Sequence, residues 1–501
     1  MNKTICFFVT FYSSAVCMAA DEYDHQQPNI LFVVADDQSY PYTSAYGSSM
    51  VHTPAFDEIA SEGCLFSNAY VTCPGSSPSR ASILTGRYIW QIEEAGTHAS
   101  CFPQRYICFP DLLLAEGYHI GYTGKGWAPG DWAYSGRKYN PAGPEYNEHK
   151  HTPPYKGISS VDYVGNFKQF YEEKDKTKPF YFWFGAHEPH RVFEKDSWRR
   201  NQKQIGNAEI PTSLPDHPVV AGDVLDYAVE IEWYDKQLLK MINFLKEKGE
   251  WDNTIVVVTA DNGMSFPGSK ATCYDSGIHV PLAIRWKGHI PSKRISDLVS
   301  TVDLMPTLLE AIGIQAELDF PMTGLSMLSW LTGKTNIPPR NAIFAGRERH
   351  SCARWGNKGY PIRAIRWENY LYIRNYQPNY WPAGDPLYYC GDSLKTAFWD
   401  IDTSPSKQFL IDYATDAEIK PFYLKAMGKR PSEELYNVEK DPGCMYNLTQ
   451  DSRYQIVLSN VRELLKNELI RTNDQRTINN NYESVWESYP RLKGPMRKFP
   501  Q

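Results

Sequence analysis

Residues 73–87 read CPGSSPSRASILTGR. Pro78 suits the first turn of a helix, where a missing N–H costs nothing, and Gly86 suits the position just past its end. Ser76 is therefore expected just before a short helix, whose free N–H groups and dipole favour an anion. Arg80, one turn further on, adds a fixed positive charge. This combination suggests chemistry on an oxyanion ester, and the alternative is a capped surface helix that carries two serines.

Apolar runs elsewhere in the chain predict the sheet that carries this helix. Asn29–Ala35 and Thr254–Ala260 are continuous apolar segments, which are typical of strands buried on both faces. Tyr118–Thr123 and Pro179–Ala186 are two further candidate strands. Because helical segments alternate with these strands, the pattern predicts a doubly wound α/β sheet. The expected helices span residues 54–62, 109–115, 161–173 and 224–248.

Polar residues follow each of the four strands. They are Asp36-Asp37, Gly124-Lys125, His187–His190 and Asp261-Asn262. Ligands of open parallel sheets bind outside the carboxyl ends of the strands, so we expect these residues to meet Ser76 at one site. The four acidic and amide side chains offer only oxygen ligands, which select calcium or magnesium over zinc. The alternative is that these acids only cap loops.

The pattern SSPSR at residues 76–80, followed by LTGR at 84–87, resembles the signature of the type I sulfatases. In that family the first residue, Cys or Ser, is oxidised to formylglycine, whose hydrate is the nucleophile. Cys73 does not fit, since Gly75 and Ser77 occupy the places of the proline and the arginine. The resemblance therefore implies a serine-type sulfatase, modified at Ser76 by a partner maturing enzyme. It also implies an alkaline-phosphatase-like sandwich, with a large, mostly parallel mixed sheet between helices and a smaller antiparallel sheet.

The same resemblance assigns roles to individual residues. It implies that Arg80, Lys125 and Lys270 hold the sulfate group and stabilise its charge. His187 is the expected acid for the leaving group, since histidine can hold a proton near neutral pH. The metal would be calcium, with magnesium as the alternative, and a phosphatase-like pair of zinc ions would need histidines beside the aspartates. The expected metal ligands are Asp36, Asp37, Asp261, Asn262 and residue 76.

One position departs from the family pattern. Sulfatases usually carry Gly-Lys-x-His where this chain has Gly124-Lys125-Gly126-Trp127. The histidine that would assist the nucleophile is therefore missing at position 127. His98 lies close to the signature in sequence and is the candidate replacement.

Within the family the chain is most similar to the sulfamidases, which remove the N-sulfate of glucosamine in heparan sulfate. The likeness lies in residues 76–87, 187–191, 266–267 and 360–363. Residues 346–350 fall where sulfamidases place substrate-reading residues, so Arg347 and His350 are expected to bind a neighbouring uronate or sulfate of a glycosaminoglycan. The alternative for these two residues is a charged turn.

Other functions remain open from the sequence. An O-sulfatase acting on glucosamine, galactosamine or uronate esters is the nearest alternative. A phosphoesterase of the same superfamily is disfavoured by Asp261-Asn262 and by the two lysines. If Ser76 is not oxidised, the protein would be a non-catalytic binder of sulfated glycans.

Length and composition limit the domain organisation and the partners. The chain has 501 residues, of which 42% are hydrophobic, and this suffices for one large and one smaller domain. We expect a catalytic domain at 21–335 and a C-terminal subdomain at 336–501 with a small antiparallel sheet. The net charge of −6 disfavours nucleic acids and other polyanions as general partners, so a sulfated glycan would need a local basic pocket.

The N-terminus predicts export. Residues 1–20 carry a lysine, an apolar stretch and small residues, which is the pattern of a cleaved signal peptide. No later apolar run is long enough to span a membrane, so a periplasmic protein is expected, with secretion or surface attachment as alternatives. Eight of the ten cysteines lie after this segment. An exported chain can pair them, and Cys101 with Cys108 is the expected pair.

Overall fold

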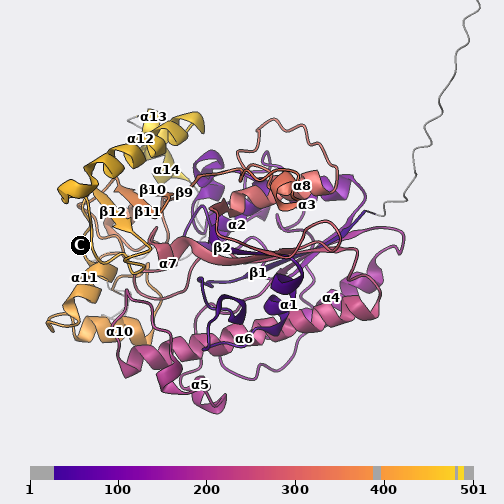
Figure 1. Ribbon diagram of the computed structural model, residues 1–501, viewed down its shortest axis with the longest axis horizontal. Coiled ribbons are helices and arrows are strands. Elements are labelled where there is room, and N and C mark those ends of the chain that lie inside the picture. Colours follow the sequence, from indigo (N-terminus) through magenta and orange to yellow (C-terminus); the bar gives the residue numbers. More distant parts are fainter. Residues whose placement is uncertain (1–26, 388–396, 480–482, 490–501) are drawn as a thin grey trace, which may run out of the picture.

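The computed structural model describes residues 27–387, 397–479 and 483–489, so the predicted signal peptide lies outside the described residues. Two sheets build the molecule and lie side by side (Figure 1). Eight strands form the larger sheet: β1 (Asn29–Ala35), β2 (Cys64–Tyr70), β3 (His119–Gly124), β4 (Phe180–Gly185), β5 (Thr254–Ala260), β6 (His279–Arg285), β7 (Lys293–Ile295) and β8 (Val299–Ser300).

The order in the larger sheet is β3-β4-β1-β5-β6-β2-β7, with β8 also paired to β2. Strands β3, β4, β1 and β5 are parallel neighbours, whereas β6 runs antiparallel to β5 and β2. The predicted mixed, mostly parallel sheet is confirmed. Because the four predicted strands are adjacent and parallel, their carboxyl ends lie at the same edge.

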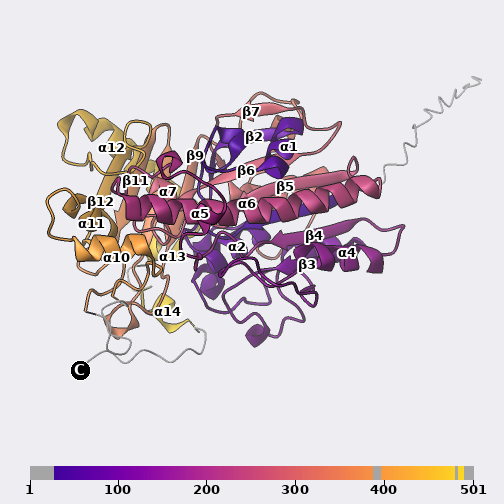
Figure 2. The ribbon, with the colours of Figure 1, turned by 90° about the horizontal axis from the view of Figure 1, so that it is seen from below.

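The apolar run at residues 29–35 is continuous because both faces of strand β1 are buried. Leu31 and Val33 belong to one hydrophobic core, and Ile30 and Phe32 belong to the core on the opposite face. Each fully buried side chain of this size stabilises the fold by about 1.5–3 kcal/mol. The first core is covered by α1 (Pro54–Glu62), α4 (Tyr163–Glu173) and α6 (Pro218–Glu247), and α6 crosses the sheet face in Figure 2. The second is covered by α2 (Ser76–Thr85), α3 (Phe109–Ala115) and α8 (Leu304–Ala311).

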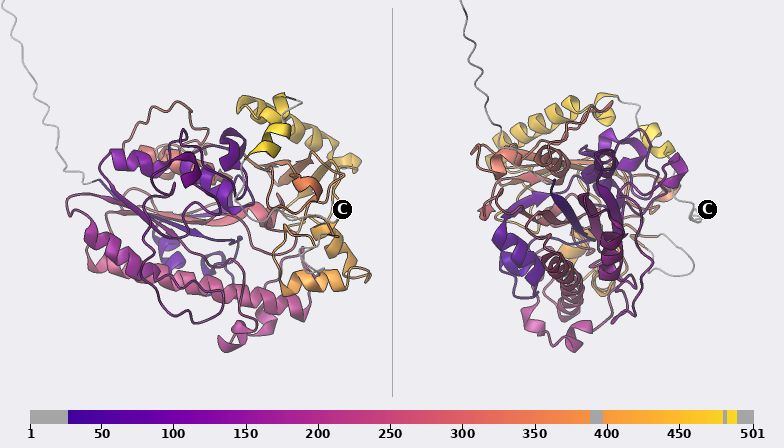
Figure 3. Two further views of the ribbon diagram at one scale, coloured as in Figure 1. Left: turned by 180° about the vertical axis from the view of Figure 1, so that it is seen from behind. Right: turned by 90° about the vertical axis from the view of Figure 1, so that its right-hand side faces the viewer.

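The smaller sheet is entirely antiparallel, in the order β12-β11-β10-β9. Its strands are β9 (Ala342–Arg347), β10 (Ile362–Trp367), β11 (Tyr370–Asn375) and β12 (Glu433–Asn437). Helix α12 (Gln455–Arg471) lies against this sheet in Figure 3, and its buried face shares a core with strand residues Phe344 and Ile365. This confirms the predicted antiparallel sheet in the C-terminal part.

Short helices complete the described part of the chain. None of the helices that the structure describes has the length and apolarity needed to cross a membrane. The remaining helices are α5 (Ser197–Arg200), α7 (Asp275–Ile278), α9 (Leu328–Leu331), α10 (Pro405–Asp412), α11 (Lys420–Met427), α13 (Gln475–Ile478) and α14 (Glu483–Ser488).

The predicted disulfide between Cys101 and Cys108 is wrong, since both cysteines are free and buried. The backbone of Cys101 forms a bridge with Asp131. Cys108 precedes the first turn of α3, and its Sγ donates a hydrogen bond to the carbonyl of Tyr106 at 3.7 Å. Different local structures therefore hold the two thiols, although they are close in sequence.

Candidate functional site

Three buried carboxylates meet at the carboxyl edge of the large sheet. Ala35 of β1 pairs with Ala260 of β5, so Asp36 and Asp261 leave the sheet at the same level. The backbone N–H of Asp37 donates to Asp261 Oδ1 at 3.0 Å. One carboxylate oxygen from each of the three aspartates lies within 4.8 Å of the others. We call these three residues the acidic cluster.

Helix α2 brings Ser76 to the acidic cluster. Ser76 is the first residue of the helix, which thus begins one residue earlier than the sequence predicts, and the Ser76 Oγ donates to Asp36 Oδ1 at 3.1 Å. Gly86 closes the helix in the left-handed conformation, with its N–H bonded to the carbonyl of Ser82. The hydroxyl of Ser76 thus lies where the helix dipole and the free N–H groups of the first turn favour negative charge.

Each aspartate of the acidic cluster has a cationic partner. Arg80 Nε donates to Asp261 Oδ2 at 2.8 Å. Lys125 Nζ donates to both oxygens of Asp36 at 2.6 Å. Lys270 Nζ donates to Asp37 Oδ2 at 2.7 Å. The predicted sulfate-holding residues therefore surround the acids, from α2, from the end of β3 and from the loop after β5.

These pairs keep the charges in place despite burial. Burial alone would raise the pKa of Asp36, but Lys125, His190 and Arg80 hold it well below its usual range. Burial likewise opposes protonation of Lys270, yet Asp37 and Asp402 raise its pKa above the ordinary value. Asp36 and Lys270 are therefore both charged at neutral pH, whereas burial and the neighbouring Asp36 raise the pKa of Asp261 above its ordinary value.

The acidic cluster and Asn262 fit a hard divalent cation. Asn262 is fully buried, its Nδ2 donates to Asp37 Oδ1 at 2.7 Å, and its Oδ1 has no hydrogen-bond partner within the described chain. An unpaired buried carbonyl oxygen beside three carboxylates is the donor set that calcium or magnesium takes. Three carboxylates face three cationic side chains, so a divalent cation would leave the site positively charged toward an anionic substrate.

Lys270 lies between two acids rather than beside one. Its Nζ is 2.7 Å from Asp37 and 3.3 Å from Asp402, and His190 Nε2 is 3.8 Å from Asp37. The ammonium thus places a positive charge between these two carboxylates.

A pocket of about 350 Å³ opens over Ser76. This volume lies in the range of ligand sites and suits a saccharide unit. The rings of His98 and His350 face each other in its wall with centroids 4.2 Å apart. Burial lowers the pKa of His98 and lowers that of His350 to about 4, so both are neutral. Other lining residues include Lys125, His190, Arg191, Lys270, Trp399 and Asp402.

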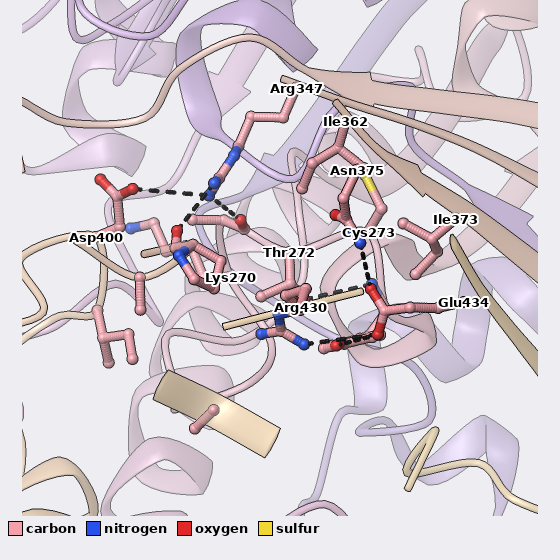
Figure 4. A pocket seen from close by; sticks show the side chains of 16 residues that line it. Lys270, Thr272, Cys273, Arg347, Ile362, Ile373, Asn375, Asp400, Arg430 and Glu434 are labelled. Carbon is pink, nitrogen blue, oxygen red and sulfur yellow. Dashed lines mark hydrogen bonds and ion pairs between the residues drawn. The ribbon is translucent and has the colours of Figure 1, made fainter. Parts of the chain in front are cut away.

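The structure does not bring Arg347 to this pocket. Figure 4 shows its guanidinium directed at Asp400, 3.8 Å away, and at the backbone of the segment after Lys270. It donates to the carbonyl oxygens of Ala271 and Pro382. Because these groups occupy its donors, Arg347 links the two sheets, and the predicted substrate contact is not supported.

The two histidines after β4 differ in position. His190 lines the pocket, whereas His187 is half-buried and its electrostatic neighbours are Asp36, Lys125 and Arg80. Burial lowers the pKa of His187 to about 4. The imidazole is therefore neutral in the free protein, and it gains a proton only where a further negative charge raises its pKa.

The departure at Trp127 has a structural reason. The indole is buried in the second hydrophobic core and packs edge-on against Phe102 with centroids 5.3 Å apart. The side chain at this position therefore belongs to the core. His98 lines the pocket with Ser76, as a candidate replacement must.

Sequence reasoning missed Asp402 of the pocket lining, and it expected His190 at the site only as part of residues 187–190, without a role of its own. His190 stands three residues after His187, and this repetition was the available signal. Asp402 belongs to the C-terminal part, and no motif marks it. Only the packing of the two sheets places it beside Lys270.

Comparisons with known proteins show which family the chain resembles. The family model "Sulfatase" matches residues 28–314, and the model "N-sulphoglucosamine sulphohydrolase, C-terminal" matches residues 268–383. The chain is 24% identical to human N-sulphoglucosamine sulphohydrolase over 488 residues, which covers 89% of this chain and 90% of the relative. It is 26% identical to an ulvan-active sulfatase of Formosa agariphila over 443 residues, which covers 86% and 78%.

Solved structures share the fold. A structure in complex with D-glucosamine-2-N,6-O-disulfate superposes with a TM-score of 0.64 at 18% identity, over 91% of this chain and 100% of that one. A 2-O GAG sulfatase superposes with a TM-score of 0.63 at 20% identity, over 90% and 93%. Because the family model covers more than half of the chain and its fold is present, the chain belongs to the sulfatase family of hydrolases.

Proposed function

We propose that this protein removes the N-sulfate of glucosamine in heparin or heparan sulfate, with residue 76 as its catalytic centre. One observation carries the proposal: Ser76 lines a sugar-sized pocket, and its Oγ lies 3.1 Å from Asp36, inside a cluster of paired acids and cations. Similarity to the C-terminal model of N-sulphoglucosamine sulphohydrolase over residues 268–383 supports the N-sulfate.

The nucleophile in this proposal is formylglycine, formed from Ser76 by a serine-type maturing enzyme. Formylglycine supplies a hydrated aldehyde, with one hydroxyl to attack sulfur and a second to expel sulfate afterwards. Asp36 orients the hydroxyl at position 76, as it does for serine in this structure. Plain serine has no second hydroxyl and would not turn over in this way.

The metal would be calcium, held by Asp36, Asp37, Asp261 and Asn262. When bound, it would polarise the oxygens around residue 76. Arg80, Lys125 and Lys270 are fixed by their carboxylate partners and would stabilise charge on the sulfuryl oxygens without moving.

Proton delivery to the leaving nitrogen is assigned to His187. The arriving sulfate brings a negative charge toward the group formed by Asp36, Lys125 and Arg80, and this charge raises the pKa of the neighbouring imidazole. His98 and His350 face the rest of the saccharide as neutral hydrogen-bonding groups.

Export to the periplasm belongs to the same proposal, because residues 1–20 have the pattern of a signal peptide. A periplasmic enzyme would meet saccharides taken up from outside the cell. An O-sulfate ester is the second candidate, since the chain is also 25% identical to an N-acetylglucosamine-6-O-sulfatase of Bacteroides thetaiotaomicron over 440 residues.

The test is sulfate release from a matched pair of substrates, glucosamine N-sulfate and glucosamine 6-O-sulfate, by protein co-expressed with a serine-type maturing enzyme. Release from the N-sulfated sugar alone is expected. Release from the 6-O-sulfated sugar alone would keep the catalytic centre and overturn the N-sulfate assignment.

A further inference from the structure

Asp402 is an acid that points into the pocket from the C-terminal part of the molecule. It precedes helix α10 and lines the pocket that contains Ser76. Among the described residues that line this pocket, it is the only acidic one. A lone carboxylate is unexpected in a pocket that receives an anionic sugar, so its position needs a reason.

The contacts of Asp402 leave room for a ligand. Its Oδ2 lies 3.3 Å from Lys270 Nζ, and this buried oxygen accepts no hydrogen bond within the described chain. Lys270 is already bonded to Asp37 at 2.7 Å. The side chain is nevertheless 32% exposed and lines the pocket, so the carboxylate offers acceptor capacity there beyond its contact with Lys270.

Asp402 carries a full negative charge. Burial alone would raise the pKa of this carboxyl, but Lys270, His190 and His350 hold it below its usual range. An ionised carboxylate accepts hydrogen bonds and donates none. It also repels a second anion at close range, and it does so more strongly away from bulk water.

A bound sulfated sugar would meet both the cationic side chains beside Ser76 and the carboxylate of Asp402. In the proposed function its sulfate would lie over Ser76 between Lys125 and Lys270, because both cations are held at the acidic cluster beside this residue. Asp402 is a direct neighbour of Lys270, so it faces the part of the sugar next to the scissile sulfate. A donor there would use this acceptor capacity, whereas an anion there would be repelled.

We propose that Asp402 is a specificity-determining residue: it accepts a hydrogen bond from an amino or hydroxyl group of the sulfated sugar, and it excludes sugars that place a second sulfate at that position. This inference rests on the proposed sulfatase activity toward glucosamine. It gives the C-terminal part of the molecule a direct part in substrate choice.

The test compares wild type with Asp402→Asn, which keeps the shape and removes the charge. The measured quantity is kcat/KM of the matured enzyme for singly sulfated glucosamine and for glucosamine N,6-O-disulfate. We expect the variant to lose about tenfold or more on the singly sulfated sugar, mainly through KM, because a hydrogen bond to a charged group is lost. The ratio of kcat/KM for the disulfated sugar to kcat/KM for the singly sulfated sugar should rise about tenfold.

Two control variants separate this role from a general effect of charge. Glu418→Gln removes an exposed carboxylate of the same part of the chain, and it should leave the ratio unchanged. Asp402→Glu keeps the charge, so it should keep most of the discrimination even if its rate falls.

Several outcomes would overturn the inference. An unchanged substrate ratio in Asp402→Asn would do so, and so would an equal fall of kcat on both sugars, which would mean that Asp402 only positions Lys270. Dissociation constants of the two sugars, measured on Ser76→Ala proteins with and without Asp402→Asn, test the same ratio without turnover. If the matured enzyme releases sulfate from neither sugar, the proposed function fails, while this binding comparison still decides the role of Asp402.

Discussion

Lys270 shows how single residues carry the chemistry of this site. It is almost fully buried, and its ammonium is held between Asp37 and Asp402. A cation fixed in this way needs no reorganisation when charge develops on a sulfuryl oxygen, and such preorganised groups are worth the most in catalysis.

Substituting Lys270 should therefore reduce the rate strongly. We expect Lys270→Gln to lower kcat of the matured enzyme about 10²- to 10³-fold, in line with the loss of one preorganised electrostatic group. The matched control is Lys420→Gln, which removes an exposed ammonium at the start of α11. A fall of less than threefold in Lys270→Gln, measured as sulfate release at saturating substrate, would contradict this role.

Burial of His350 in the pocket wall makes the stability of the folded protein depend on pH in the acid range. Burial lowers its pKa to about 4, from an ordinary value near 6.5, so between these two pH values the unfolded chain binds a proton that the folded protein does not. Stability should thus be fully present above pH 6.5 and fall as the pH drops toward 4, by at most about 3 kcal/mol from this residue. Melting temperatures between pH 7 and pH 4 measure the effect.

The variant His350→Gln isolates this contribution. It removes the titrating group and keeps a side chain that can hydrogen-bond, so its melting temperature should depend less on pH over the same range. An equally steep decline in wild type and variant would show that other groups cause the acid sensitivity.

At the scale of the element, helix α2 is set by its two ends. Gly75 precedes it in an extended conformation, and Gly86 ends it with φ 63°. A Cβ at Gly86 would also lie 3.1 Å from the side chain of Met322. The helix can therefore present Ser76 and Arg80 only if its C-terminal residue tolerates the left-handed conformation.

A side chain at Gly86 should destabilise the protein. We expect Gly86→Ala to lower the free energy of unfolding by about 1–2 kcal/mol, which is the penalty of the left-handed conformation for a residue with a Cβ. Gly206→Ala is the control, because a Cβ there meets nothing within 4 Å. Equal melting temperatures of the two variants would contradict this account of the helix end.

Regular elements were the part of the fold that the sequence revealed best. Residues 29–35, 54–62, 109–115 and 254–260 form elements with the predicted ends, because hydrophobic periodicity and proline or glycine signals mark them. Helix α6 begins at Pro218, six residues before the predicted start. His217 caps it through its ring nitrogen, and histidine is not a usual capping residue.

The sequence predicted the site residues that directly follow the parallel strands. It did not predict those contributed by the C-terminal part of the chain. Asp36, Lys125 and Asp261 were found because parallel strand ends share one edge. Asp402 and the structural role of Arg347 depend on how the second sheet packs against the first, which one sequence does not encode locally. The free thiols of Cys101 and Cys108 depend on loop geometry in the same way.

For the whole molecule, the balance of charges predicts how it responds to metal. The acids of the cluster are each paired with a cation, so the fold does not depend on a metal to compensate them. A bound divalent cation would still add stability by mass action, about 3 kcal/mol when its concentration is one hundred times its dissociation constant.

Removing the metal should therefore lower the melting temperature without unfolding the protein. We expect treatment with a chelator to lower the melting temperature by a few degrees and to stop sulfate release, and added calcium to restore both. In Asp261→Asn the calcium-dependent shift should shrink, whereas Glu418→Gln should keep it. A melting temperature that is insensitive to chelator and to calcium would contradict the metal site.

The measurement that tests the central claim most directly is sulfate release by wild type and Ser76→Ala, both co-expressed with a serine-type maturing enzyme and assayed on the same sulfated glucosamine. Mass spectrometry of the peptide that contains residue 76 accompanies the assay. The account predicts an aldehyde at residue 76 in wild type, rapid release by that protein, and loss of turnover by at least about 10³-fold in Ser76→Ala. Sulfate release by Ser76→Ala at a rate close to that of wild type would contradict it.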